Sequence, residues 1–188
     1  NIYGSNQTRA NALRAFDGRG RLKMSRGGNL PFNEEGLPNV MTASVDFFLA
    51  GDIRANEHIG LTAMHTLFVR EHNRWCNWIQ RVNRYQFRRY QHYIRRGRPD
   101  LAGPEVELLD GDGIYATARR IVTAEMQAIT YNEFLPVILG EGAIPDYQGY
   151  DPNLDPSISN IFATAAFRFG HTMIPPELLR LDGRGREI

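Results

Sequence analysis

Hydrophobic residues recur at helical spacing over one long stretch of the chain, from about residue 59 to about residue 85. Steps of three, four or seven residues separate them, so they share one face of a helix. The positions on this face are Leu61, Met64, Phe68, Trp75, Trp78 and Val82. Directly before the stretch, residues 51–57 read GDIRANE, with Arg54 and Glu57 three residues apart. The pattern therefore predicts a packed helix that anchors a cation and a carboxylate at its start, which suits chemistry on a bound ligand.

Three further helices are predicted from capping residues and from apolar periodicity. They cover residues 5–16, 113–139 and 155–173. Their expected N-caps, all of residue types that favour this position, are Ser5 or Asn6, Asp112 and Asp155. Pro136 should bend or break the end of the second of these helices. One or two helical turns are predicted over residues 42–50, and short extended segments near residues 22–24 and 30–32. The fold class is therefore mainly α, with little β, in a single domain.

The helix predicted over residues 155–173 has two different faces. Because a helix turns by about 100° per residue, one face collects an apolar stripe that we expect to be buried. That stripe consists of Ile158, Ile161, Phe162, Ala165, Ala166 and Phe169. The other side carries Arg168 and His171 one turn apart, together with Phe167. A surface of this kind could cover a flat, partly anionic ligand.

Composition narrows the classes of protein. The 188 residues are enough for one domain with a sizeable core. The formal net charge of +1 argues against a polycation that binds nucleic acid with its whole surface. The single cysteine, Cys76, excludes an intramolecular disulfide and a multi-cysteine zinc or iron–sulfur site. No apolar run reaches the length of a membrane-spanning helix, so no membrane span is expected.

One segment departs from this balanced charge. Residues 81–98 hold seven arginines and three tyrosines without an acidic residue. Basic residues interleaved with aromatic ones can form a nucleic-acid surface. We favour a solvated helix extension or an insertion, because the rest of the chain is acidic enough to cancel this charge, and we expect no nucleic-acid partner. Glycines and prolines make residues 85–111 read as an irregular connection.

Residues 51–75, GDIRANEHIGLTAMHTLFVREHNRW, resemble the haem peroxidases of the animal type, within the peroxidase–cyclooxygenase superfamily. A second block, FATAAFRFGHTMI at residues 162–174, resembles the helix that carries the proximal histidine of this family. Three shorter matches fit the same order, namely YGS at residues 3–5, LPF at 30–32 and ITYNEFLPVILG at 129–140. These motifs cover nearly the whole chain, so the resemblance implies the helical haem peroxidase fold of the animal type.

The resemblance assigns roles to four residues and implies haem b as the cofactor. His171 is the expected axial ligand of the haem iron, a role that suits neutral imidazole. Arg54 is the expected catalytic cation, because a guanidinium stays charged and donates to oxygen. Arg168 corresponds to an arginine that pairs with a haem propionate, with a solvated helix arginine as the alternative. Glu57 corresponds to a glutamate that forms an ester with a haem methyl in many members, and the alternative is a carboxylate complementing the helix dipole.

The remaining polar residues of the long helix are interpreted as structural. His65 and His72 lie two turns apart, too far for both to bind one metal ion directly, and we interpret His65 as a core residue or a neighbour of the site. The charges of residues 70–74, REHNR, are expected to tie the helix to neighbouring loops. Simple packing roles are expected for Trp75, Cys76 and Trp78.

The family's distal histidine, the carboxylate of a second haem ester and the calcium-binding loop all precede the YGS motif, which here begins at Tyr3. We therefore expect residues 1–188 to be part of a single catalytic domain that lacks these segments. Remaining segments of the same polypeptide, or cleaved chains, would complete it and supply the calcium ligands. Glu57 is a poor substitute for the distal base, being a weak base at neutral pH. The resemblance also implies an extracellular or secreted protein.

The expected activity is haem-dependent reduction of hydrogen peroxide, coupled to oxidation of halides, thiocyanate or small aromatic donors. One alternative is a fatty-acid dioxygenase of the same superfamily, which uses a tyrosyl radical; Tyr3, Tyr115 and Tyr131 are available for that role. A second alternative is a non-catalytic adhesion or matrix module that keeps the fold and binds through its arginine-rich run. Haem absorbance separates the enzymes from the module, and oxygen uptake with a polyunsaturated fatty acid separates dioxygenase from peroxidase.

Overall fold

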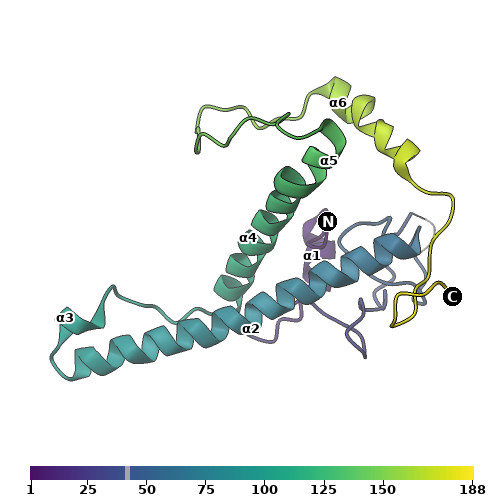
Figure 1. The fold of residues 1–188 in the computed structure, drawn as a ribbon. Helices are drawn as coiled ribbons and strands as arrows, with labels where there is room; N and C mark the ends of the chain where they lie inside the picture. The colour runs from purple at the N-terminus through teal and green to yellow at the C-terminus, as the bar shows by residue number, and fades with distance from the viewer. Residues whose placement is uncertain (41–42) are drawn as a thin grey trace. The chain divides into compact units, whose positions relative to one another are not determined.

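The computed structural model describes residues 1–40 and 43–188, which form two compact units. Unit 1 is Asn1–Ile144 and unit 2 is Pro145–Ile188. Regular structure in the described residues is almost entirely helical (Figure 1). Strand pairing within them is confined to isolated antiparallel bridges, which join Arg14 to Leu22, Phe32 to Phe48 and Leu181 to Glu187. The predicted fold class, mainly α with little β, is confirmed.

Unit 1 is built around one long helix, α2, with α4 leaving it near its middle (Figure 1). The elements of unit 1 are α1 (Gln7–Leu13), α2 (Ile59–Arg95), α3 (Pro99–Ala102), α4 (Gly111–Ile129), a π-helical segment (Thr130–Phe134) and α5 (Leu135–Leu139). The elements of unit 2 are α6 (Asn160–Thr164) and a 3₁₀ segment (Ala166–Met173).

Helix α2 begins at Ile59, as predicted, but it ends at Arg95 rather than near residue 85. Residues 81–96 are mostly arginine, glutamine and other residues that a helix accepts at low cost. The first strong breakers are Gly97, which has a positive φ of 65°, and Pro99. The irregular connection predicted for this region is therefore wrong in its first part.

The buried face of α2 lies beside the predicted one. Met64 and Trp78, which the periodicity places in the core, are 51 % and 45 % exposed. The helix instead buries Val69, His72, Cys76 and Ile79. His72 lies near the centre of this face, so the spacing of apolar residues alone does not identify the face as buried. Long-range packing against α4 and the N-terminal loops thus selects the face.

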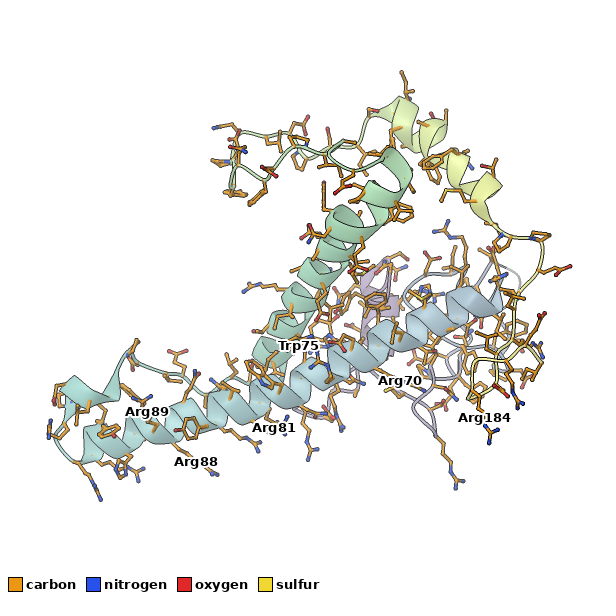
Figure 2. All side chains as sticks on the ribbon, in the orientation of Figure 1. Arg70, Trp75, Arg81, Arg88, Arg89 and Arg184 are labelled. Atoms are coloured by element: carbon orange, nitrogen blue, oxygen red, sulfur yellow. The ribbon has the colours of Figure 1, made fainter. Side chains whose placement is uncertain are left out.

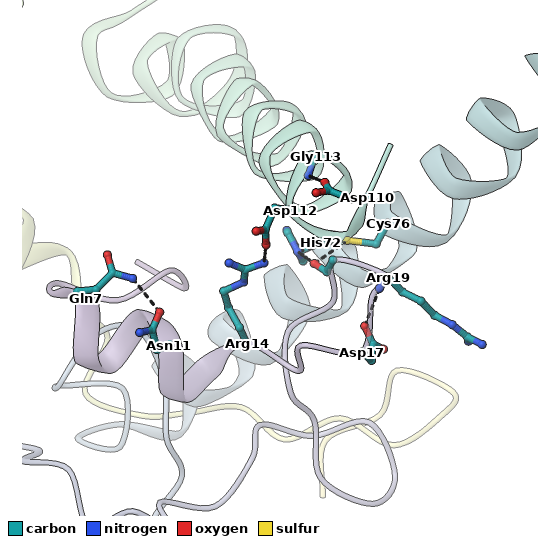
Figure 3. Close-up of polar contacts among 11 residues, drawn as sticks. Gln7, Asn11, Arg14, Asp17, Arg19, His72, Cys76, Asp110, Asp112 and Gly113 are labelled. Carbon is teal, nitrogen blue, oxygen red and sulfur yellow. Dashed lines mark hydrogen bonds and ion pairs between the residues drawn. The ribbon is translucent and has the colours of Figure 1, made fainter. Parts of the chain in front are cut away.

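Helix α4 starts earlier than predicted. Its N-cap is Asp110 rather than Asp112, and Asp110 Oδ1 accepts a hydrogen bond from the backbone N–H of Gly113 at 2.7 Å. Asp112 instead forms an ion pair with Arg14, as Figure 3 shows. Part of the predicted stripe is buried, but Met126 and Ile129 are exposed. The buried members are Ile114, Ala118 and Val122.

Pro136 distorts the end of this helical region, as predicted. The regular turns of α4 give way to the π-helical segment, and α5 then carries Pro136 in its first turn. The backbone N–H of Leu135 bonds to the carbonyl oxygen of Thr130 in the wider turn. Proline lacks a backbone donor, so a wider turn before it accommodates the lost hydrogen bond.

Helix α1 is shorter than the predicted range of residues 5–16, but one of its two expected caps is confirmed. The side chain of Asn6 accepts a hydrogen bond from the backbone N–H of Arg9 at 2.9 Å. The helix buries Ala12 and Leu13 against the core of unit 1.

The helical turns predicted over residues 42–50 are wrong for residues 43–50, and residue 42 lies outside the described residues. Residues 45–46 form a turn, and residues 47–49 are held by backbone hydrogen bonds to another segment. Asn33 N–H donates to Phe47 O at 2.8 Å, and Leu49 N–H donates to Pro31 O at 2.7 Å. Such pairing is a long-range effect that helical periodicity does not report.

Unit 2 contains less helix than the predicted range of residues 155–173. Asp155 accepts the backbone N–H of Ser157 in a local turn, whereas the cap of α6 is Ser159, whose Oγ accepts the N–H of Phe162. The predicted burial of the apolar stripe is also wrong, because Ile161 is 77 % exposed and Phe162 is 49 % exposed. So short a segment cannot build a core of its own.

Candidate functional site

The GDIRANE turn, residues 51–57, is held by backbone contacts. Gly51 lies so close to the N-terminal segment that an added Cβ would come within 2.4 Å of Asn1 O. The Asn56 side chain accepts the N–H of Phe48 at 3.1 Å and donates to Phe48 O at 2.9 Å. The backbone of the turn is thus fixed from both sides, which agrees with the anchored arrangement that the sequence predicts.

Arg54 projects from this turn in a defined orientation. Its Nε and Nη2 donate to Asp52 Oδ1 and Oδ2, both at 2.9 Å. The Arg54 side chain is nevertheless 63 % exposed, against 20 % for Asp52. Hydrogen bonding to Arg54 lowers the pKa of Asp52, and the same bonds raise the pKa of Arg54. The result is a permanently charged donor, oriented by an ionised carboxylate and with further N–H groups left for a ligand.

Glu57 stands just outside α2. Its backbone N–H donates to Arg54 O at 2.9 Å, so the two residues share one turn. Its carboxylate is exposed and forms no hydrogen bond or ion pair with the residues that the structure describes. The N-cap of α2 is His58, whose Nδ1 accepts the N–H of Gly60 at 3.0 Å. Capping of the helix therefore falls to the histidine, and the Glu57 carboxylate acts on Arg54 through its charge.

A buried polar cluster lies where α2 meets the N-terminal segment and α4. His72 is fully buried, with Nδ1 at 3.0 Å from the Tyr3 hydroxyl and Nε2 at 3.0 Å from Gly20 O. Cys76 Sγ lies 3.3 Å from His72 Nε2 (Figure 3). Burial lowers the pKa of His72 and raises the pKa of the Cys76 thiol to about 12. The cluster is therefore neutral, and its geometry is that of a structural hydrogen-bond centre.

The REHNR segment, residues 70–74, joins α2 to the preceding loops. Arg70 Nε donates to Gly28 O at 2.6 Å. The Asn73 side chain accepts the N–H of Leu22 at 2.8 Å and donates to Leu22 O at 3.0 Å. The predicted network is thus confirmed for Arg70, whereas Glu71 and Arg74 pair with each other within α2 and the second tie to the loops comes from the uncharged Asn73.

Sequence reasoning missed Arg9, which is buried behind the GDIRANE turn. Arg9 is 3 % exposed, and its Nη1 donates to Ala50 O at 2.7 Å. Its Nη2 donates to Pro38 O and to Asn39 Oδ1. Burial lowers the pKa of this guanidinium. The only local signal is its position one turn before the buried Ala12, which is weak because most arginines on helices are solvated.

Unit 2 carries Arg168 and His171 on the 3₁₀ segment. Arg168 Nε donates to Thr164 O at 3.0 Å, and its guanidinium carbon lies 5.2 Å from the ring centroid of Phe167. His171 is exposed and forms no hydrogen bond with any residue in the described ranges. The aromatic residues around them are 42–49 % exposed, namely Phe162, Phe167 and Phe169. An imidazole, a guanidinium and apolar rings are thus available to a flat ligand.

The structure brings the four predicted site residues together as two pairs, each within its own unit. Arg54 and Glu57 share one turn, and Arg168 and His171 share the 3₁₀ segment. Across residues 1–40 and 43–188, no group of three or more histidine, cysteine, aspartate or glutamate residues is placed to hold a metal ion. A haem iron needs only one such ligand from this chain. Within the same residues, no helix is both long and apolar enough to span a membrane.

Comparison with known proteins defines the class. The family described as animal haem peroxidase matches residues 1–188. The chain therefore belongs to the animal haem peroxidase family. Among solved structures, it is similar to peroxidase A from Dictyostelium discoideum, with a TM-score of 0.76 and 28 % sequence identity. That match covers 100 % of this chain and 33 % of the other.

The similar curated proteins include peroxidasins. The peroxidasin homolog of Homo sapiens is 42 % identical over 195 residues, which cover 97 % of this chain and 12 % of that protein. Peroxidasin of Drosophila melanogaster is 44 % identical over 147 residues, covering 77 % of this chain and 8 % of the relative. Lactoperoxidase of Homo sapiens is 44 % identical over 144 residues, which cover 75 % of this chain and 17 % of lactoperoxidase. The chain thus spans only a small share of these proteins.

Proposed function

We propose that the complete protein is a haem-dependent peroxidase, which reduces hydrogen peroxide and oxidises halides, thiocyanate or small aromatic donors. Family membership over residues 1–188 supports the class of reaction. The observation that carries the proposal is the state of Arg54, which two hydrogen bonds to Asp52 hold in place while its side chain stays 63 % exposed. A fixed but open guanidinium is suited to stabilising charge that develops on a bound oxygen.

Unit 2 fits the cofactor. We assign His171 as the axial ligand of the haem iron and Arg168 as the partner of a haem propionate. The ring nitrogens of His171 have no hydrogen-bond partner among the described residues, so one is free to ligate iron and the other to donate to an acceptor. Phe167 and its aromatic neighbours offer apolar contact to a flat macrocycle. When bound, the haem supplies the redox chemistry of peroxide reduction.

Arg54 acts on the peroxide by hydrogen bonding and charge. Its free N–H groups donate to the peroxide oxygens and stabilise negative charge on the leaving oxygen. Asp52 keeps the guanidinium in one orientation and accepts no proton itself, because its pKa is lowered by the bonds to Arg54. We assign the proton-carrying distal base to a segment outside this chain.

We assign Glu57 to an ester with a haem methyl. Its carboxylate is exposed and forms no ion pair among the described residues, so it is accessible to a haem methyl group. His58 caps α2 through its side chain, and complementing the helix dipole is the alternative role of the Glu57 charge. Family membership further supports calcium bound by ligands outside this chain, and an extracellular or secreted location. On this proposal, residues 1–188 are part of one catalytic domain that the remaining segments of the polypeptide, or cleaved chains, complete.

The test uses the longest available form of the protein with haem, and measures peroxide-dependent oxidation of a simple phenol. Arg54→Ala should lower kcat about a hundredfold at unchanged haem content, the size expected for one lost charge-stabilising donor. Arg26→Ala is the matched control, because Arg26 is exposed and forms no ion pair in the described residues. Equal activity of Arg54→Ala and wild type would overturn the assignment. Oxygen uptake with a polyunsaturated fatty acid, without oxidation of the phenol, would instead indicate a dioxygenase. Failure of the protein to bind haem would indicate a non-catalytic module.

A further inference from the structure

The part of α2 beyond its crossing with α4 forms an arm, residues 80–95 (Figure 1). The chain that returns from α3 packs along one side of this arm. The Asn83 side chain donates to Glu107 O at 2.9 Å and accepts the N–H of Leu109 at 2.8 Å, and Ala102 of α3 is buried. One side of the arm is therefore occupied by the protein itself.

The other side carries four arginines in a row, which we name the arginine stripe; two of them, Arg81 and Arg88, are labelled in Figure 2. The members of the stripe are Arg81, Arg84, Arg88 and Arg95. At about 100° per residue they fall within roughly 60° of one another, whereas Asn83 lies about 130° from their mean direction. At about 1.5 Å per residue the stripe is ~21 Å long. All four are exposed and lie on the free side of the arm, and the exposed Arg89 and Arg96 extend the positive charge about 60–80° beyond the stripe.

The charge of the stripe is not compensated within the described residues. None of its four guanidinium groups forms a hydrogen bond or an ion pair there. No acidic residue occurs between Glu71 and Asp100, and Asp100 is engaged by Arg98. Like charges three or four residues apart on a helix repel one another by a few tenths of a kcal/mol per pair. The row therefore gives the fold no stability of its own, which points to an anionic partner.

We propose that the arginine stripe binds a linear sulfated polysaccharide. The planar guanidinium fork pairs with two oxygens of a sulfate group, and is less strongly hydrated than an ammonium group. A flexible chain with sulfates along its length can follow a straight row of charges. The arginine stripe and the polysaccharide thus complement each other in charge and shape, without apolar contacts.

Nucleic acid fits the stripe less well. Single-stranded nucleic acid binds where aromatic side chains stack on its bases along the same surface as the cations. The nearest tyrosine, Tyr85, lies about 40° outside the sector of the stripe, and Tyr90 and Tyr93 lie on the packed side. The phosphates of a duplex wind around its axis, so a straight row of four charges meets few of them.

The experiment compares two fourfold variants of the full chain with equal net charge. The stripe variant is Arg81→Gln, Arg84→Gln, Arg88→Gln and Arg95→Gln. The matched control replaces four exposed arginines outside the arm that form no ion pair in the described ranges, Arg19→Gln, Arg26→Gln, Arg120→Gln and Arg184→Gln. The dissociation constant of a heparin decasaccharide is measured by calorimetry at two salt concentrations, with circular dichroism as the check on helix content. The stripe variant should bind about tenfold more weakly and with a smaller salt dependence, whereas the control should stay within about twofold of wild type.

Equal weakening in both variants would overturn the proposal, because net charge alone would then explain binding. Unchanged binding by the stripe variant would overturn it as well. Single-stranded RNA, duplex DNA and phosphatidylserine vesicles serve as competing probes, and stripe-dependent binding of any of them that is tighter than that of the decasaccharide would reject a polysaccharide partner. If the glutamine substitutions reduce helix content, the four stripe arginines are replaced by lysine instead. This variant should bind the decasaccharide about threefold more weakly than wild type, because lysine lacks the planar guanidinium group that pairs with two sulfate oxygens.

Discussion

Arg54 of unit 1 and His171 of unit 2 are held in opposite ways. In unit 1, Arg54 stands on a turn that the close packing of Gly51 and the two bonds of Asn56 fix in place. In unit 2, Arg168 and His171 are exposed on a short 3₁₀ segment. Unit 1 thus orients the Arg54 side chain through its own contacts, whereas on the proposed function a bound ligand would orient the exposed His171 side chain. Substitutions that disrupt the packing of unit 1 should therefore lower the free energy of unfolding. Substitutions of Arg168 or His171 in unit 2 should weaken ligand binding instead.

The largest expected loss of stability comes from Gly20. Its φ is +73°, and an added Cβ would lie 2.5 Å from the backbone nitrogen of Tyr115 in α4. Gly20→Ala should lower the free energy of unfolding by about 3–4 kcal/mol, through backbone strain and overpacking. Gly18 is the matched control, since its φ is +71° with nothing within 4 Å of the added Cβ. Gly18→Ala should cost only about 1 kcal/mol in urea unfolding. Equal costs would contradict the close approach.

Substituting one histidine in each unit tests the difference between the two units. His72→Ala should lower the free energy of unfolding by about 3 kcal/mol, because it opens a cavity and leaves the buried Tyr3 hydroxyl without its partner. His171→Ala should change it by less than about 0.5 kcal/mol, since the residue is exposed. Thermal unfolding without haem measures both. A similar loss from the two substitutions would break the distinction between the units.

The hydrogen bonds between Asp52 and Arg54 give a smaller effect, expressed in activity. Asp52→Asn cannot accept two charge-assisted bonds, so Arg54 loses its fixed orientation. Peroxide-dependent kcat should fall about tenfold with little change in the KM of the donor. Asp46→Asn is the control, because Asp46 is exposed and forms no ion pair among the described residues. Full activity of Asp52→Asn would show that Arg54 needs no positioning.

The smallest expected effect is the pH dependence that His72 contributes. Burial lowers its pKa below the ordinary value of 6.5, so the unfolded state binds a proton that the folded state does not. Its contribution to stability is present above pH 6.5 and is lost as the pH falls toward the lowered pKa, by at most about 1.4 kcal/mol per pH unit. Urea unfolding between pH 7 and pH 5 should show a weaker slope in His72→Gln than in wild type. The exposed His92→Gln should keep the wild-type slope.

Local signals in the sequence predicted much of unit 1. The start of α2 at Ile59, the cap at Asn6 and the distortion before Pro136 follow from residues close to one another in the chain. The buried face of α2 could not be predicted, because its central residue is His72, whose partners Tyr3 and Gly20 are distant in sequence.

The candidate site divides in the same way. The anchored turn around Arg54 follows from its sequence, but the buried Arg9 behind it does not, since its partners lie at residues 38–50. In unit 2, the periodicity of residues 155–173 predicted a regular helix with a buried stripe. Periodicity reports which residues share a face but not whether a neighbour covers that face, and the unit is too small to cover it alone.

The haem absorbance spectrum of the complete protein, with wild type beside His171→Ala, tests whether His171 is the axial ligand of the haem iron. Wild type should show an intense Soret band. The band should be lost or clearly shifted in the variant, and partly restored when imidazole is added as a free ligand. Unfolding of the variant without haem should match wild type, which separates loss of ligation from loss of fold. A Soret band and peroxide-dependent activity that stay unchanged in His171→Ala would contradict the assignment of His171 as the axial ligand.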